Sequence, residues 1–237
     1  MHNEDKAWVE YREKFADVYD ERNYESPLQS WVMRASHKLT ERPFDSSVQF
    51  GRVLEIGAGT GEHLPFVRHQ FDEYVLTDMD PKTLDIAAKK IGDQYGGRVS
   101  YSVQTGADID CADNSYDRVI ATHVLEHIYH PHLALKEWRR VLKPGGTLSI
   151  LIPTDPGFAW RLGRRLGPRK AALAMGIPYD YVMAREHVNP CNNLMAILKH
   201  YFPEAQESWW PTRLPAMDLN LFVAFHAVVD KPDVASR

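Results

Sequence analysis

Short runs of apolar residues alternate along this chain with segments whose apolar residues recur every three or four positions. Runs at 53–56, 74–77, 119–121 and 147–152 predict buried strands, because strands covered on both faces carry apolar residues continuously. The helical spacing predicts helices between them, for example over 81–91. The pattern therefore predicts an α/β fold, in which strands alternate with helices.

Two helices are expected before the first strand. The first carries apolar residues at helical spacing, namely Trp8, Tyr11, Phe15 and Val18. The second opens with Ser26-Pro27-Leu28-Gln29, a capping-box pattern with proline at the first helical position. Its apolar face is expected to consist of Leu28, Trp31, Val32, Ala35 and Leu39. These helices either pad the sheet or form a lid over a ligand pocket.

The chain after the last apolar run changes character. Residues 154–188 contain frequent glycine and proline, which predicts short helices joined by turns. Asn189-Pro190 marks the start of a further helix. Residues 219–229 alternate between apolar and other residues, which predicts a strand.

The segment 53–61 carries the most specific chemistry. Its apolar run ends in Gly57, Gly59 and Gly61, and alternating glycines let a backbone turn sharply and approach a ligand closely. Leu64 and Val67 are spaced for one face of a helix that follows directly. A strand, a glycine loop and a helix N-terminus in this order form a nucleotide-cradling arrangement.

The glycine spacing distinguishes two kinds of cofactor. A dinucleotide fingerprint requires glycine at position 62, where this chain has Glu62, a negative charge near the expected pyrophosphate. The G-x-G-x-G pattern preceded by Glu55 resembles motif I of the class I S-adenosylmethionine-dependent methyltransferases. Their cofactor lacks a pyrophosphate and carries a positive sulfonium.

Asp78 supports the same resemblance. It ends the second apolar run and follows Gly57 by 21 residues, near the offset of about 20 at which a carboxylate binds a ribose diol. A carboxylate suits this task because it accepts two hydroxyl hydrogen bonds. Asp80 precedes Pro81 and is expected to cap a helix instead.

Further matches follow in the family's order. Residues 113–120 resemble the turn into strand four, 123–127 the segment that leaves it, and 140–152 the turn into strand five and the strand itself. The resemblance implies a doubly wound, mostly parallel, Rossmann-like sheet of seven strands, with an antiparallel last strand and helices on both faces. It also implies S-adenosyl-L-methionine as the cofactor. The residues it implies for cofactor binding are Glu55, Gly57, Ala58, Gly59, Gly61, Asp78, Met79, Asp108 and His123.

The adenine-binding acid is the least well matched element. Counting back from Asp113 places Thr105 at the expected position, while Asp108 fits with a small gap. Asp108 is the preferred acceptor for the adenine amino group, and a solvated loop acid is the alternative.

His123 follows strand four, at the edge of the sheet where ligands of α/β proteins bind. Its imidazole is the candidate general base, and packing beside the cofactor is the alternative. Residues 123–127 also fit the H-x-x-E-H zinc pattern, but that pattern requires a helix, whereas His123 is expected at a strand end. No metal is therefore expected.

The segment between Gly157 and Ile177 contains five cations and no acid: Arg161, Arg164, Arg165, Arg169 and Lys170. They form a solvated face, bind an anionic acceptor, or settle Trp160, Leu162 and Leu166 on an anionic membrane. An anionic acceptor is preferred. The candidate substrate residues are Arg164, Arg165, Tyr179, Tyr181, Glu186 and His187.

Length and composition favour a single soluble domain over residues 1–237. The motifs divide it into a helical cap (1–50), a cofactor core (51–153), a substrate-covering insertion (154–188) and a C-terminal part (189–237). A net charge of −4 gives no reason to expect nucleic acid. Two distant cysteines, Cys111 and Cys191, indicate neither a disulfide framework nor a zinc site. The polar N-terminus is unlike a signal peptide, so a cytoplasmic location is expected.

These patterns predict methyl transfer from S-adenosylmethionine to a hydroxyl or amine of a small, anionic or lipid-like acceptor. The alternatives are a nicotinamide-dependent dehydrogenase and a cofactor-binding subunit without catalytic activity. The acceptor and the oligomeric state stay open.

Overall fold

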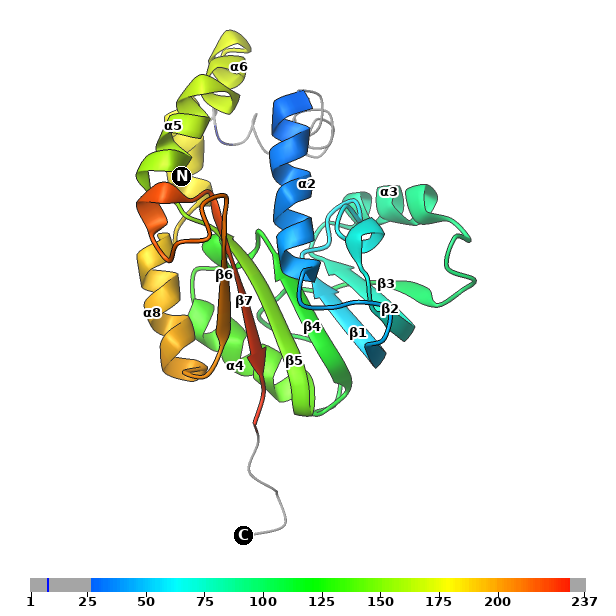
Figure 1. The fold of residues 1–237 in the computed structure, drawn as a ribbon. Coiled ribbons are helices and arrows are strands. Elements are labelled where there is room, and N and C mark those ends of the chain that lie inside the picture. The colour runs from blue at the N-terminus through cyan, green and yellow to red at the C-terminus, as the bar shows by residue number, and fades with distance from the viewer. Residues whose placement is uncertain (1–7, 9–26, 231–237) are drawn as a thin grey trace, which may run out of the picture.

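The computed structural model describes Trp8 and residues 27–230. Within them, one seven-stranded sheet has the order β3-β2-β1-β4-β5-β7-β6 (Figure 1). Its strands are β1 (Gln49–Ile56), β2 (Gln70–Asp78), β3 (Val99–Val103), β4 (Tyr116–Thr122), β5 (Leu142–Pro153), β6 (Gln206–Trp210) and β7 (Phe222–Val228). Strands β1 to β5 pair in parallel, and β7 is antiparallel to both β5 and β6. The expected fold class is confirmed.

Helices cover both faces of the sheet. On one face lie α4 (Pro131–Val141) and α8 (Cys191–Tyr201), whose Trp138 and Leu194 are buried in the largest core cluster. On the other face lie α2 (Pro27–Glu41) and α3 (Pro81–Ile91), which bury Leu39 and Leu84 in two further clusters. The chain therefore builds two hydrophobic layers around a sheet that is buried on both sides.

The strand order reverses between β1 and β4. These neighbours pair in register up to Ile56 and Ala121, so their carboxyl ends lie side by side. Such a reversal point opens the crevice in which α/β sheets bind ligands. The segments that follow β1, β2 and β4 are therefore the place to look for a site.

The insertion after β5 folds into three short helices, as expected. They are α5 (Phe158–Leu166), α6 (Pro168–Ala174) and α7 (Tyr179–Glu186). Figure 1 shows α5 and α6 rising beyond the end of the sheet at which β5 ends. The predicted C-terminal helix and period-two strand are confirmed as α8 and β7.

The helix expected directly after the glycine loop is absent. Its place is taken by a three-residue 3₁₀ turn, η1 (Leu64–Phe66), and Val67 already has an extended ψ of 127°. Only eight residues separate Gly61 from β2, and Pro65 lies among them. The interval is too short for a helix and a return to the sheet. Leu64 and Val67 still pack against one core cluster, so their spacing shows a shared buried side and not a helix.

Helix α2 begins at Pro27, as the capping pattern predicted, but only part of its predicted face is buried. Leu39 is buried and Val32 packs against the same cluster. Leu28 and Trp31 are 69% and 58% exposed. The side chains that are buried, besides Leu39, are polar: Ser36, His37, Thr40 and Glu41. The apolar stripe therefore predicted Leu28 and Trp31 wrongly, and it did not reveal the polar network that is buried at the end of this helix. The helix predicted around Tyr11, Phe15 and Val18 lies outside the described residues.

None of the helices in the described part of the chain combines the length and the apolar character that crossing a membrane requires.

Candidate active site

The glycine loop after β1 has the backbone that its sequence predicted. Gly57, Gly59 and Gly61 all have positive φ, at 64°, 53° and 78°. A Cβ on Gly57 would lie 2.5 Å from Val124, and one on Gly61 would lie 2.9 Å from Ile91. A Cβ on Gly59 would meet no atom within 4 Å, so this residue borders open space. The outer glycines thus allow close packing, and the middle one faces the crevice.

Asp78 lies beside this loop at the end of β2. Its Oδ2 accepts the backbone N–H of Gly59 at 2.9 Å, and its Oδ1 accepts that of Asp80 at 2.9 Å. Each carboxylate oxygen keeps a lone pair for a further donor. Asp80 caps α3 by accepting from the Lys82 N–H at 2.9 Å, as expected. Met79, between the two acids, is 68% exposed.

The loop after β3 packs over the end of β1. A Cβ on Gly106 would lie 2.9 Å from Ile56, and the indole N–H of Trp138 donates to the Gly106 carbonyl at 2.6 Å. Thr105 and Asp108 face each other in an isolated bridge within this loop, and Asp108 is exposed. Both candidates for the adenine acceptor therefore lie on one small loop next to β1.

Glu55 lies in the core instead of the crevice. It is 1% exposed, and its Oε2 accepts the hydroxyl hydrogen of Tyr74 at 2.6 Å. Burial raises the pKa of this carboxyl above its ordinary value. Its carboxylate thus contacts β2, and the cofactor contact expected of Glu55 does not come from the side chain in this arrangement.

A buried ionic network connects α2 to the centre of the sheet. The guanidinium of Arg118 on β4 donates to both carboxylate oxygens of Glu41, at 2.7 and 3.0 Å, and both side chains are fully buried. His63 Nε2 lies 3.0 Å from Glu41 Oε1, and His63 Nδ1 lies 3.1 Å from His37 Nδ1. Burial alone would raise the pKa of Glu41, but the Arg118 charge and the His63 hydrogen bond lower it far below its ordinary range.

The same arginine also contacts the neighbouring strand, β5. Its Nε and Nη2 both donate to the Ser149 hydroxyl at 3.1 Å, and that hydroxyl lies 3.1 Å from His226 Nδ1. The Ser149 oxygen already accepts from arginine, so its own hydrogen donates to His226. The sequence analysis missed this network, although Arg118 inside an apolar strand was a signal, since a buried arginine requires an anionic partner.

His123 occupies the expected strand end, directly after β4, in the left-handed region with φ 59°. Its Nε2 lies 3.0 Å from the Ser36 hydroxyl, which itself donates to the Met33 carbonyl at 2.7 Å. Ser36 must therefore accept the Nε2–H, which leaves the lone pair on Nδ1. Burial, and then the charges of His127 and His187, lower the pKa of His123 to about 3. A general base that works near neutral pH would have a higher pKa than this.

The insertion brings several predicted substrate residues next to His127. His187 follows α7, and its Nδ1 lies 2.9 Å from Asp155 Oδ2. Arg164 binds the same carboxylate oxygen at 3.2 Å and stacks on the Tyr179 ring. The backbone carbonyl of Glu186 accepts from His127 at 2.8 Å. Tyr181 lies apart from this group, where its hydroxyl contacts Arg185.

The five cations of the insertion do not act alike. Asp155 pairs with Arg164, and Asp180 pairs with Arg169 at 2.7 Å, so acids just outside the basic interval neutralise two of them. Arg161 and Arg165 are exposed and form no ion pair with a described residue. They line a hollow of about 460 Å³ with Phe158, Leu162, Arg164, Arg169 and Asp180.

Comparison with known protein families finds a match over the core of the chain. The family model described as "Methyltransferase domain" matches residues 54–150. The match covers less than half of the chain, and it shows similarity to methyltransferase domains over these residues. The match covers both the glycine loop and Asp78, so the expected resemblance is confirmed over the core that carries them.

Curated relatives match part of the chain. Methyltransferase AacuQ from Aspergillus aculeatus is 36% identical over 102 residues, which are 43% of this chain and 32% of that protein. The ubiquinone/menaquinone biosynthesis C-methyltransferase UbiE from Geotalea daltonii is 30% identical over 133 residues, 54% of each chain. This chain thus spans about half or less of the length of these relatives.

Solved structures share the whole fold. A methyltransferase from Thermotoga maritima, described as a possible histamine N-methyltransferase, is 20% identical, with a TM-score of 0.63 over 94% of this chain and all of that one. The N-methyltransferase NodS from Bradyrhizobium japonicum, in complex with S-adenosyl-L-homocysteine, is 14% identical, with a TM-score of 0.61 over 96% of this chain and all of that one.

Proposed function

We propose that this protein transfers a methyl group from S-adenosyl-L-methionine to a small acceptor. The observation that carries the proposal is the open face of Gly59 beside the Asp78 carboxylate. The loop offers a surface without side chains for the cofactor, and Asp78 offers acceptors for the ribose hydroxyls. The methyltransferase family match over this loop and the NodS complex with the demethylated cofactor support the proposal.

The glycine loop argues against the dehydrogenase alternative. Glu62 stands where a dinucleotide fingerprint requires glycine, and its carboxylate forms an ion pair with Lys90 on α3. A carboxylate at this position disfavours a pyrophosphate, whereas S-adenosylmethionine has none. The other alternative, a cofactor-binding subunit without catalytic activity, would also bind S-adenosylmethionine. A methyl-transfer assay distinguishes it from the proposed enzyme.

Relatives do not converge on one acceptor atom: UbiE is named a C-methyltransferase and NodS an N-methyltransferase. We assign a hydroxyl or amine acceptor with an anionic group, because Arg161 and Arg165 line the hollow of the insertion and form no ion pair with a described residue. Transfer from a sulfonium needs mainly alignment of the nucleophile, the methyl carbon and the sulfur. We assign that alignment to His123 and the insertion residues.

Two glycine variants test the cofactor site. Gly59→Val should abolish binding of S-adenosylmethionine, because its side chain fills the open space of the crevice. Gly96→Val is the matched control, since Gly96 also has positive φ, 59°, and no atom within 4 Å of a built Cβ. Calorimetric titration with S-adenosylmethionine and with NAD⁺ should show binding of the first alone. Equal affinity of both variants for S-adenosylmethionine would refute the assignment.

A further inference from the structure

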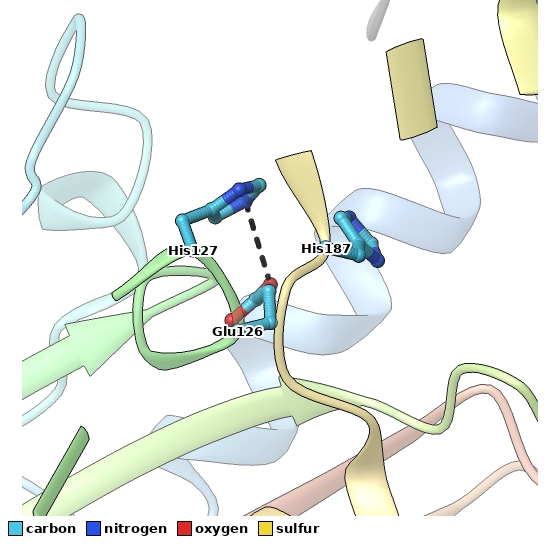
Figure 2. Close-up of side chains that lie close together, drawn as sticks. All are labelled: Glu126, His127 and His187. Atoms are coloured by element: carbon cyan, nitrogen blue, oxygen red, sulfur yellow. Dashed lines mark ion pairs between the residues drawn. The ribbon is translucent and has the colours of Figure 1, made fainter. Parts of the chain in front are cut away.

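We propose that Glu126, His127 and His187 form a binding site for a divalent transition-metal ion of the Zn²⁺ or Mn²⁺ kind. Glu126 and His127 belong to the 3₁₀ turn η2 (Leu125–His127) after β4, and His187 follows α7. One carboxylate oxygen and one nitrogen from each histidine lie within 4.8 Å of one another. Figure 2 shows the three side chains gathered from these two segments. The H-x-x-E-H pattern supplies two of these ligands, but the third comes from the insertion, and His123 is not among them.

The Glu126 carboxylate has no hydrogen-bond donor from another described residue. Its side chain is 2% exposed, and Oε2 has no hydrogen-bond partner in the described part of the chain. Oε1 has only long contacts, 3.8 Å to His123 Nδ1 and 3.9 Å to His127 Nε2. A buried carboxylate without donors or a cation costs several kcal/mol. A metal ion beside the two histidines would satisfy it.

Both histidines are held in the tautomer that a metal requires. His127 Nδ1 donates to the Glu186 carbonyl at 2.8 Å, which leaves the lone pair on Nε2. Nε2 is the nitrogen that faces Glu126 (Figure 2). His187 Nδ1 donates to Asp155 at 2.9 Å, which likewise leaves Nε2 as the ligand atom. Metal-binding histidines typically donate their other nitrogen to a carbonyl or carboxylate in this way.

The two segments are fastened to each other. The Asn189 N–H donates to the Glu126 carbonyl at 3.1 Å, and its side-chain amide donates to the carbonyls of Leu125 and Ile128 at 3.3 and 2.6 Å. His187 therefore cannot move far from η2. Metal–ligand bonds of about 2.0–2.2 Å place two ligands of one ion about 3–4 Å apart. Small side-chain rotations suffice to close the present arrangement on an ion.

The ligand types select the class of ion. Two imidazoles and one carboxylate suit Zn²⁺, Mn²⁺ or Fe²⁺, whereas Mg²⁺ and Ca²⁺ prefer oxygen alone. Three protein ligands leave at least one coordination position open. His127 is 37% exposed, while Glu126 and His187 are 2% and 11% exposed, so the open position lies on the His127 side.

The role of the ion rests on the proposed function. Bound next to the end of β4, it would hold the acceptor oxygen and lower the pKa of an acceptor hydroxyl. The hydroxyl proton passes to water, the oxygen forms a bond to the methyl carbon, and the carbon–sulfur bond breaks to leave a neutral thioether. The metal ion would then promote deprotonation of the acceptor hydroxyl, so no protein side chain is needed as a general base.

Zn²⁺ and Mn²⁺ titrations of the chelator-treated protein test the site. The wild type should bind one ion, and Glu126→Gln and His187→Gln should each weaken binding at least tenfold. His130→Gln is the matched control, because His130 and His132 form an exposed histidine pair elsewhere on the surface, with ring centroids 6.1 Å apart. Circular dichroism and the melting temperature of each variant establish that it is folded. The melting temperature of the wild type should rise with Zn²⁺ and that of Glu126→Gln should not, since a ligand stabilises the state it binds.

Binding of equal strength in the wild type and Glu126→Gln, or no binding by the wild type at 1 mM ion (about the weakest affinity of functional sites), would overturn the site. Loss of binding in His130→Gln alone would assign the ion to the surface pair instead. S-adenosylmethionine titration of the same proteins is a separate readout. Metal binding without cofactor binding leaves the site standing and refutes the proposed function, and methyl transfer without metal binding does the reverse.

Discussion

The Asp78 carboxylate accepts the backbone N–H of Gly59 at 2.9 Å, so the acid at the end of β2 holds the glycine loop at the end of β1. The same carboxylate is the expected ribose acceptor. Its hydrogen bonds to Gly59 and Asp80 fix its orientation before a cofactor arrives. One side chain therefore shapes the loop and supplies a binding group to it.

Asp78→Ala should weaken S-adenosylmethionine binding by about 1–3 kcal/mol, the cost of losing a charged hydrogen-bond partner. Asp78→Asn should weaken it less, because the amide oxygen still accepts from Gly59. Calorimetric titration measures both, and Asp110→Asn, an exposed acid after β3, serves as the control. An Asp78→Ala protein with wild-type affinity and intact circular dichroism would remove Asp78 from the site.

The loop and the sheet could be predicted from the sequence because their signals are local. Glycines at alternate positions specify a backbone conformation, and continuous apolar runs specify buried strands. The ordered matches over 53–152 then fixed the strand sequence. These features depend on neighbours in the chain and not on what packs against them.

The buried faces and the grouped side chains could not be predicted in the same way. Glu41 and Arg118 are 77 residues apart, and nothing local shows that they pair. The burial of His37 and Glu41 on α2 follows from that pair and overrides the apolar stripe of Leu28 and Trp31. Likewise, the neighbourhood of His187 and His127 depends on how the insertion folds back.

Breaking the central ion pair should destabilise the fold. Glu41→Gln leaves the Arg118 charge buried without an anion, which typically costs about 3–5 kcal/mol. The double variant Glu41→Leu with Arg118→Met should cost less than Glu41→Gln alone, because it buries no charge. Urea unfolding at pH 7 gives both values. A Glu41→Gln protein as stable as the wild type would show that the pair contributes nothing to the free energy of unfolding.

His226 should make the fold sensitive to acid. Burial, and then the Arg118 charge, lower its pKa to about 4 from an ordinary value near 6.5. The unfolded chain therefore binds a proton more readily than the folded one between these values, so the contribution is complete above pH 6.5 and is lost as the pH falls toward 4. The loss attributable to His226 is at most about 3.5 kcal/mol at about 1.4 kcal/mol per pKa unit.

His226→Asn removes the titrating group and keeps a polar atom next to Ser149. The decline in unfolding free energy between pH 7 and pH 4.5, measured with urea, should be shallower in this variant than in the wild type. His200→Asn, which changes an exposed histidine at the end of α8, should decline like the wild type. His69, whose pKa burial also lowers to about 4, keeps a residual acid sensitivity in every protein. Parallel curves for His226→Asn and the wild type would contradict the assignment.

His123 should act by position more than by proton transfer. Its Nε2–H is donated to Ser36, which leaves the lone pair on Nδ1. Burial lowers the pKa of this imidazole to about 3, so Nδ1 is a weak proton acceptor near neutral pH. His123→Asn should therefore lower turnover less than tenfold and leave cofactor affinity unchanged. A loss of about 10²–10⁴-fold, the range of general base catalysis, would restore the role of proton acceptor. Ser36→Ala controls for the loss of the hydrogen bond alone.

The two unpaired cations of α5 should determine how the acceptor binds. Arg164 already pairs with Asp155, so its replacement would disturb the site itself, whereas Arg161 and Arg165 are exposed beside the hollow. Arginine forks bind carboxylates and phosphates bidentately. For acceptors with such a group, found by screening with labelled methyl donor, Arg161→Gln with Arg165→Gln should raise KM at least threefold and leave cofactor affinity unchanged. Salt should weaken acceptor binding more in the wild type than in this variant.

The comparison with Lys136→Gln, an exposed cation on α4 across the sheet, removes the effect of net charge. Phe158, Leu162 and Leu166 are 58%, 45% and 66% exposed on the same helix, so a membrane surface is the competing partner. If the double variant keeps its KM and no longer sediments with anionic vesicles, the cations bind lipid headgroups and the acceptor is held elsewhere. If neither property changes, the two arginines are a solvated face and the anionic character of the acceptor is refuted.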